Sequence, residues 1–236
     1  ALLDLDTAKA KKYTDTKSVK EESGYTSPFC YPLWPCDRVG EYILAKSAVA
    51  GAMIQYMASD NEDVPNQSPS NHLLGVGGQC LEDGTEVYLD QDQANTVNGY
   101  GVTTAINQNG YRLWGNYTGA YPASSDAKDI WFAVRRMFSW QGNNFIQTYF
   151  DEVDDPMNNV LVQSVVDSEN IRCSAYAPKY WAGASIEYKS DDNPKTAILA
   201  GTMKFRQHIA PYTPAQEIVD IIDYDTDTLA AAVGGN

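Results

Sequence analysis

Residues 101–119 read GVTTAINQNGYRLWGNYTG and contain a strand–turn–strand pattern. Apolar residues lead into the polar sequence of residues 107–110, and Tyr111 resumes the apolar pattern after it. Asn and Gly tolerate the left-handed backbone that a tight turn requires. The pattern predicts two short antiparallel strands joined by this turn. Because a two-stranded hairpin is only marginally stable alone, we expect it to pack on a larger body.

Length and composition indicate a globular chain. Its 236 residues are enough for one large domain or two small ones, and 43% of them are hydrophobic. No apolar run approaches the ~20 residues that span a membrane, and the first residues lack the charged-then-apolar order of a signal peptide. The chain does not begin with Met, so we expect a processed chain or part of a longer one.

Acidic residues dominate the charge of the chain. The formal net charge is −14, and no Lys or Arg occurs between Lys46 and Arg112. An acidic surface repels phosphate groups, so nucleic-acid binding is not expected. Solubility is the simpler explanation of the acid excess, and a basic partner surface is the alternative.

The four cysteines are Cys30, Cys36, Cys80 and Cys173. Their spacing matches neither a zinc site nor a Cys-x-x-Cys redox motif. We expect free thiols in a reducing compartment, two of them buried. A bridge between Cys30 and Cys36 stays open as an alternative.

Residues suited to catalysis or metal binding are sparse. His72 and His208 are the only histidines, and the chain has no Gly-x-Ser-x-Gly sequence for a nucleophile. The acidic runs at residues 151–155 and 191–193 do not follow the twelve-residue calcium loop. We therefore predict no catalytic residue, no cofactor site and no metal site, and a protein that is not an enzyme.

Aromatic content supports an alternative of another class. The chain has 16 Tyr and 5 Trp, and these rings together with carboxylates could line a cleft for sugars. A carbohydrate-binding or carbohydrate-cleaving module is therefore the second hypothesis. The competing interpretation is that the aromatic rings fill cores and subunit contacts.

Periodicity predicts further elements on both sides of the hairpin. Ser47 is a suitable helix N-cap, and Gly51 inside that helix indicates a close packing contact. Ile130, Phe132 and Val134 alternate with other residues and predict a strand. The expected helices cover residues 47–58, 139 to about 150 and 155 onward, and the expected strands cover residues 128–138, 184–189 and 202–209.

Several short motifs occur in the order found in contractile tail sheath subunits, which the chain resembles. Tyr117 departs from the pattern, because the family usually has Arg before the Thr. The paired Arg135 and Arg136 are the most specific short match. The matching positions are Pro32, Trp34, Pro35, Gly101, Val102, Ile106, Gly110, Leu113, Trp114, Gly115, Thr118, Arg135, Arg136 and the sequence APYTPAQEI at residues 210–218. The match is to the carboxy-terminal half of the family's chains, or to a short member.

The resemblance and the local patterns together predict a mixed α/β body, a smaller α+β carboxy-terminal portion and extended terminal arms. Residues 1–22 are rich in Lys and acids and are expected to be too polar to pack, so they form an amino-terminal arm. Residues 23–119 form the α/β portion and residues 120–215 the α+β portion. Residues 216–236 form a carboxy-terminal strand and arm.

The resemblance also implies a function. Sheath subunits form hexameric rings that stack around a tail tube, and contraction drives the tube through a target envelope. The implied partners are copies of the chain, the tube protein, a baseplate and a tail terminator, without nucleic acid, membrane insertion or a cofactor. The implied location is a virion tail, or a related injection particle, assembled in the host bacterial cytoplasm.

Two regions are candidates for contacts between subunits. Arg135 and Arg136 are expected to find carboxylate partners in this acidic chain. The apolar sequence at residues 218–224 carries acids on both faces, which favours an edge strand or an added strand over a buried one. Its candidate residues are Ile218, Asp220, Ile222 and Tyr224. Residues 139–179 are expected to supply part of the grip on the tube.

Overall fold

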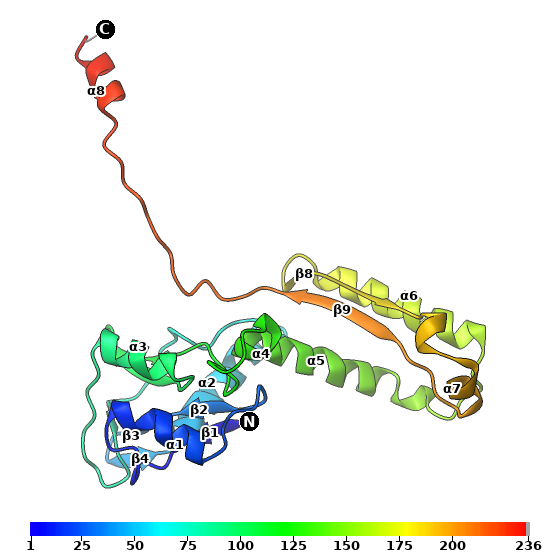
Figure 1. The fold of residues 1–236 in the computed structure, drawn as a ribbon, viewed down its shortest axis with the longest axis horizontal. Helices are drawn as coiled ribbons and strands as arrows, with labels where there is room; N and C mark the ends of the chain where they lie inside the picture. The colour runs from blue at the N-terminus through cyan, green and yellow to red at the C-terminus, as the bar shows by residue number, and fades with distance from the viewer. Residues whose placement is uncertain (235–236) are drawn as a thin grey trace.

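A computed structural model describes residues 1–234 of the chain. Two folded parts and a tail follow one another along the sequence (Figure 1). We name them the body (residues 1–131), the distal portion (residues 132–211) and the C-terminal segment (residues 212–234). The helix α5 (Phe132–Thr148) leads out of the body and forms one side of the elongated distal portion. The predicted domain boundaries after residues 22, 119 and 215 stay predictions.

The first residues are part of the body. Strand β1 (Leu2–Asp4) pairs in parallel with β2 (Tyr31–Leu33), and the 3-10 helix η1 (Tyr13–Asp15) leads into α1 (Thr16–Glu22). The expectation that residues 1–22 are too polar to pack is wrong. Their few apolar residues fall on the inner side and join a buried cluster, while most of the lysines stay exposed. The cluster members from this region are Leu5, Ala10 and Val19.

A second sheet and a helix complete this side of the body. Strands β3 (Cys36–Val39), β4 (Tyr42–Leu44) and β5 (Gly78–Cys80) form an antiparallel sheet in the order β4-β3-β5. The predicted helix is confirmed as α2 (Lys46–Asp60). A Cβ on Gly51 would lie 3.2 Å from the Leu2 side chain, which agrees with the predicted close contact. The buried face of α2 runs through Ala50 and Ile54.

The predicted hairpin is confirmed. Helix α3 (Gln91–Gly99) precedes β6 (Thr104–Asn107), which pairs antiparallel with β7 (Tyr111–Trp114). The turn places Asn109 and Gly110 at φ angles of 54° and 106°, the left-handed backbone expected from the sequence. The Thr103 N–H donates to the Pro32 carbonyl at 2.8 Å, so the hairpin extends the pairing of β2.

The predicted strand at residues 128–138 is wrong, because this stretch is helical. It forms α4 (Ala127–Ile130) and the start of α5 (Phe132–Thr148). Alternation over a few residues does not distinguish a strand from one helical face. The buried positions of α5 instead follow the helical period, and they are Ala133, Val134, Met137 and Gln141.

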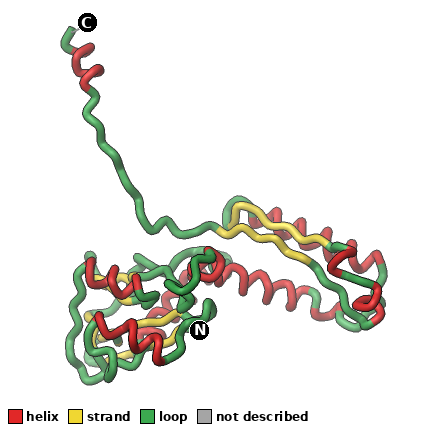
Figure 2. Tube along the Cα trace, in the orientation of Figure 1, coloured by secondary structure: helices red, strands yellow, loops and turns green. Residues whose placement is uncertain are grey.

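The distal portion is a helical pair with a two-stranded sheet along it (Figures 1 and 2). Strands β8 (Trp181–Glu187) and β9 (Arg206–Pro211) are antiparallel and pack on a cluster that contains Met137, Cys173 and Trp181. The predicted helix and both predicted strands of this region are confirmed with shifted ends. The elements are η2 (Phe150–Glu152), α6 (Asn159–Tyr176), β8 (Trp181–Glu187), η3 (Ser190–Asp192), α7 (Lys195–Leu199) and β9 (Arg206–Pro211).

The C-terminal segment runs away from both folded parts and ends in the short helix α8 (Thr226–Ala232), as Figures 1 and 2 show. Residues 218–224 form no strand within the described chain, because no other strand pairs with them. The extended arm at this end is therefore confirmed, and its pairing with another copy stays a prediction. No helix within residues 1–234 is both long enough and apolar enough to cross a membrane.

Candidate subunit-contact surface

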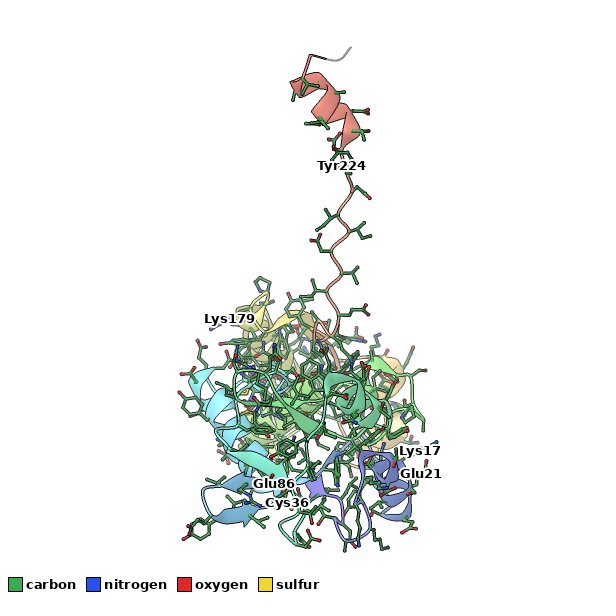
Figure 3. The ribbon with its side chains drawn as sticks, turned by 90° about the vertical axis from the view of Figure 1, so that its left-hand side faces the viewer. Lys17, Glu21, Cys36, Glu86, Lys179 and Tyr224 are labelled. Atoms are coloured by element: carbon green, nitrogen blue, oxygen red, sulfur yellow. The ribbon has the colours of Figure 1, made fainter. Side chains whose placement is uncertain are left out.

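The C-terminal segment exposes an unusual amount of apolar surface. Ile218 and Ile222 are each 88% exposed, and Tyr224 is 76% exposed. Figure 3 places Tyr224 far from the packed side chains of the two folded parts. No hydrogen bond joins residues 217–224 to the rest of the described chain. Asp220 is exposed as well, so all four residues that the sequence suggested for this segment are exposed in the described chain.

One edge of the β8–β9 sheet is closed by a side chain. The Asn170 amide on α6 donates to the Ile186 carbonyl at 3.0 Å. In return, the Ile186 N–H donates to the Asn170 side-chain oxygen at 3.0 Å. These two bonds imitate the pairing that a neighbouring strand would give. The outer edge of β8 is therefore occupied at Ile186.

The outer edge of β9 is open. Ile186 lies opposite Gln207 in the sheet, and its backbone groups point away from β9. Because residue pairs alternate along an antiparallel ladder, the backbone groups of Gln207 and Ile209 also point away from β8. No group in residues 1–234 hydrogen-bonds to them. An unpaired strand edge of this kind is a template for another strand.

A groove of about 590 Å³ adjoins the beginning of β9. Gly142 and Phe145 of α5 form one wall, and residues 203–207 form the other. Two of the nearby basic side chains have acidic neighbours, because Arg206 pairs with Asp192 at 2.6 Å and the His208 ring lies 2.9 Å from a Glu187 carboxylate oxygen. Lys204, just before this strand, forms no ion pair within residues 1–234.

The two adjacent arginines differ in their surroundings. Arg135 pairs with Asp129 at 3.1 Å and lies over the Phe29 ring, 4.0 Å from its centre. Arg136 lies 5.5 Å from the centre of the Phe132 ring, and burial lowers its pKa to about 10. It forms no salt bridge within residues 1–234. The predicted carboxylate partner is therefore confirmed for Arg135. For Arg136, which packs against the Phe132 ring within its own chain, a carboxylate partner stays a prediction.

A polar groove of about 1040 Å³ lies between the body and the beginning of the C-terminal segment. Its walls include the aromatic residues Trp114, Tyr117, Tyr121 and Tyr212, with many amide and hydroxyl groups. Glu217 is the only carboxylate among the residues that line it. The pair of carboxylates that glycoside cleavage requires is not assembled in this groove.

Sequence reasoning missed Asn170, Gln207 and the polar groove. Each depends on residues that are far apart in the chain, such as residues 66–71 and 212–217 in the groove. The only local signal for Asn170 is its place in the last half of α6, beside the buried Glu169. A polar pair on the inner side of a helix indicates a specific partner, but not which one.

The chain is similar in sequence to curated tail sheath proteins. It is 27% identical over 197 residues to the major tail sheath protein of Serratia phage KSP20, which covers 80% of this chain and 48% of that protein. It is 28% identical over 180 residues to the tail sheath protein of Burkholderia phage BcepMu, which covers 72% of this chain and 36% of that protein. The match to the tail sheath protein of Escherichia phage P2 is 22% over 215 residues, covering 86% and 52%. No protein-family model matches the chain.

Solved structures show the same fold. A sheath complex of an extracellular contractile injection system in the contracted state, PVC, matches with a TM-score of 0.79 and 17% identity, covering 97% of this chain and 64% of that one. A chain of the anti-feeding prophage baseplate matches with a TM-score of 0.75 and 19% identity, covering 95% and 60%.

These similarities confirm the resemblance to contractile tail sheath subunits and the mixed α/β fold. The chain spans about half the length of the curated relatives that it matches.

Proposed function

We propose that this chain is a structural subunit, or the carboxy-terminal half of one, in a contractile tail sheath. Copies would form hexameric rings that stack around a tail tube, and contraction would drive the tube through a target envelope. The curated relatives are named tail sheath proteins, and one structural neighbour is a sheath complex in a contracted state. Another comes from a six-fold symmetrised baseplate, which supports the ring.

The observation that carries this proposal is an unpaired segment together with an unpaired edge on the same chain. Residues 217–224 present exposed aliphatic side chains and hydrogen-bond to nothing in the described chain. The outer edge of β9 offers backbone donors and acceptors. Strand addition between copies would satisfy both and would cover the exposed aliphatic residues.

Charge supports the same pairing. The segment carries Glu217, Asp220 and Asp223, and Lys204, just before the strand β9, forms no ion pair within residues 1–234. Opposite charges favour a correct encounter and register more than they add affinity. Backbone hydrogen bonds would then hold two subunits together while their folded parts rotate.

Other partners follow from the same proposal. Residues 139–179 contain the second half of α5 and all of α6, and they would supply a small, polar contact to the tube protein that releases on contraction. A baseplate and a tail terminator would meet the two ends of the sheath. The particle would be a phage tail or a related injection device assembled in the bacterial cytoplasm, without a cofactor, because the energy is stored in assembly.

Deletion of residues 216–236 tests the proposal. The shortened chain should stay soluble and folded by circular dichroism, and it should fail to form polymers. Electron microscopy of the parent chain should show a hollow, striated cylinder. A second deletion of residues 226–236 removes α8 but keeps residues 217–224, so it separates the helix from the strand. Stacked rings built by the first deletion would contradict the proposal.

A further inference from the structure

The C-terminal segment is fastened to the body at one point. The Tyr117 hydroxyl donates to the Gln216 side-chain oxygen at 2.8 Å, across 99 positions of sequence. We propose that Tyr117 is a positioning residue, a latch that fixes the direction in which the segment leaves the subunit. The purpose of the latch rests on the proposed function, whereas its existence can be tested in the single chain.

The body holds Tyr117 rigidly. Its ring is stacked between Tyr121, with ring centres 3.9 Å apart, and Trp131, at 5.0 Å. A β-bridge pairs its backbone with Trp131, and the Thr118 N–H donates to the Ile130 carbonyl at 2.8 Å. Burial raises the pKa of Tyr117, which keeps the hydroxyl protonated and able to donate. The hydroxyl is therefore a fixed point of the body.

A second bond holds the segment to the distal portion. The Tyr212 hydroxyl donates to the Pro178 carbonyl at 3.0 Å. Residues 212–216 thus span from the distal portion to the body, with one hydrogen bond near each end. No hydrogen bond follows between Gln216 and α8 within the described chain. The direction of the free part is consequently set at Gln216 and not at the end of β9.

The latch can open. Tyr212 and Gln216 lie in the wall of the polar groove of about 1040 Å³, so the segment between them has room to move. The bond from Tyr117 to Gln216 is exposed, and an exposed hydrogen bond is readily exchanged for bonds to water. Once it opens, the segment can pivot about Tyr212. A donated strand could then keep its partner while the body of its own subunit turns.

Distances between spin labels test the latch in the full 236-residue chain. Labels are attached at Asp92→Cys on α3 and at Asp220→Cys in the segment, in a Cys30→Ser background that leaves only buried cysteines besides them. Tyr117→Phe removes the hydroxyl and keeps the stacked ring, and Gln216→Leu removes the acceptor. The matched control is Tyr56→Phe, because Tyr56 is 71% exposed and its hydroxyl bonds to nothing in the described chain.

The population of detached conformers should rise about fivefold in Tyr117→Phe and in Gln216→Leu, and stay unchanged in Tyr56→Phe. The double variant should have the same population of detached conformers as either single variant, because both substitutions remove the same bond. The latch is overturned if the distribution of distances between the labels is the same in Tyr117→Phe as in the parent, or if this distribution is already broad in the parent. If no chain forms polymers, the parent included, the proposed function is overturned. The distances between the labels still test the latch in that case.

Discussion

The ammonium group of Lys46 contacts the carboxylate of Asp37 at a place in the body where both side chains are completely buried. Lys46 begins α2 and Asp37 lies on β3, so the pair joins helix and sheet. Burial lowers the pKa of Lys46 and raises the pKa of Asp37, and the attraction between them opposes both shifts. The second carboxylate oxygen of Asp37 has no hydrogen-bond partner in the described chain.

Removing one member of this pair leaves the other as an uncompensated buried charge. We expect Lys46→Met to lower the free energy of unfolding by about 3–5 kcal/mol in urea titrations. The double variant Lys46→Met/Asp37→Leu should recover much of this loss, because it buries no charge. Lys9→Met serves as the control, since the ion pair of Lys9 with Glu22 is exposed and its loss should leave the free energy of unfolding nearly unchanged. A single variant as stable as the parent would contradict the expectation.

Lys20 predicts a dependence of stability on pH. Its ammonium group is buried and donates to the carbonyls of Tyr100, at 2.8 Å, and Tyr121. Burial lowers the pKa of Lys20 from 10.5 to about 8. Between these values the unfolded chain holds the proton that the folded chain has lost, so stability rises with pH in this window and not below it.

The parent should therefore gain stability relative to Lys20→Met as the pH is raised from 8 toward 10.5, because the methionine variant lacks this proton. Unfolding in urea at a series of pH values measures the difference. Lys17→Met, at an exposed position of the same helix that Figure 3 labels, should follow the parent. Parallel curves for the parent and Lys20→Met would show that Lys20 does not titrate in this range.

Charge reversal tests the role of Arg135 and Arg136. We expect both Arg135→Glu and Arg136→Glu to impair polymer formation, and Arg136→Glu, which buries an unpaired carboxylate, also to lower the stability of the single chain. The pair of Arg135 with Asp129 is partly exposed, so its loss should cost about 1 kcal/mol or less. Lys17→Glu, at an exposed position of α1, controls for the change in net charge. Normal sheaths from both arginine variants would exclude these residues from a subunit contact.

The open edge of β9 can be blocked without a change of charge. Proline is tolerated in a strand where its nitrogen faces away from the partner strand, as at Gln207, and it cannot donate to an added strand. We expect Gln207→Pro to fold and to stop polymer formation, measured by sedimentation. Gln207→Ala loses the same 3.1 Å bond to Gln141 but keeps the N–H, so it should polymerise. If both variants polymerise equally, the contact between subunits does not use the open edge of β9.

The elements that the sequence predicts correctly are those with local causes. The hairpin of β6 and β7 follows from the turn chemistry of Asn109 and Gly110, which needs no information from distant residues. The stretch at residues 128–138 lacks such a signal, and its short alternation agrees equally with the buried face of α5. Residues 1–22 are polar on average, but three of their apolar residues lie at positions that let this region pack on the body. The average composition therefore gave the wrong expectation.

The contact residues are harder to predict, because they depend on tertiary structure. The ring that Arg136 packs against belongs to Phe132, four residues earlier, and the two become neighbours only because this stretch is a helix and not the predicted strand. The role of Asn170 depends on a strand that begins eleven residues later and on where α6 lies beside it. The exposed segment at residues 217–224 is the exception, since acids among aliphatic residues already indicate a strand that no core can bury.

The segment that would be donated and the edge that would receive it are different surfaces of one chain. A contact between unlike surfaces is heterologous, so every joined pair has a head and a tail. Copies linked in this way either close into a ring or continue as an open filament. An open filament then has one end with a vacant β9 edge and an opposite end with a loose segment. A protein that caps one end would therefore need a different surface from a protein that caps the other, so starting and stopping such a polymer could be controlled separately.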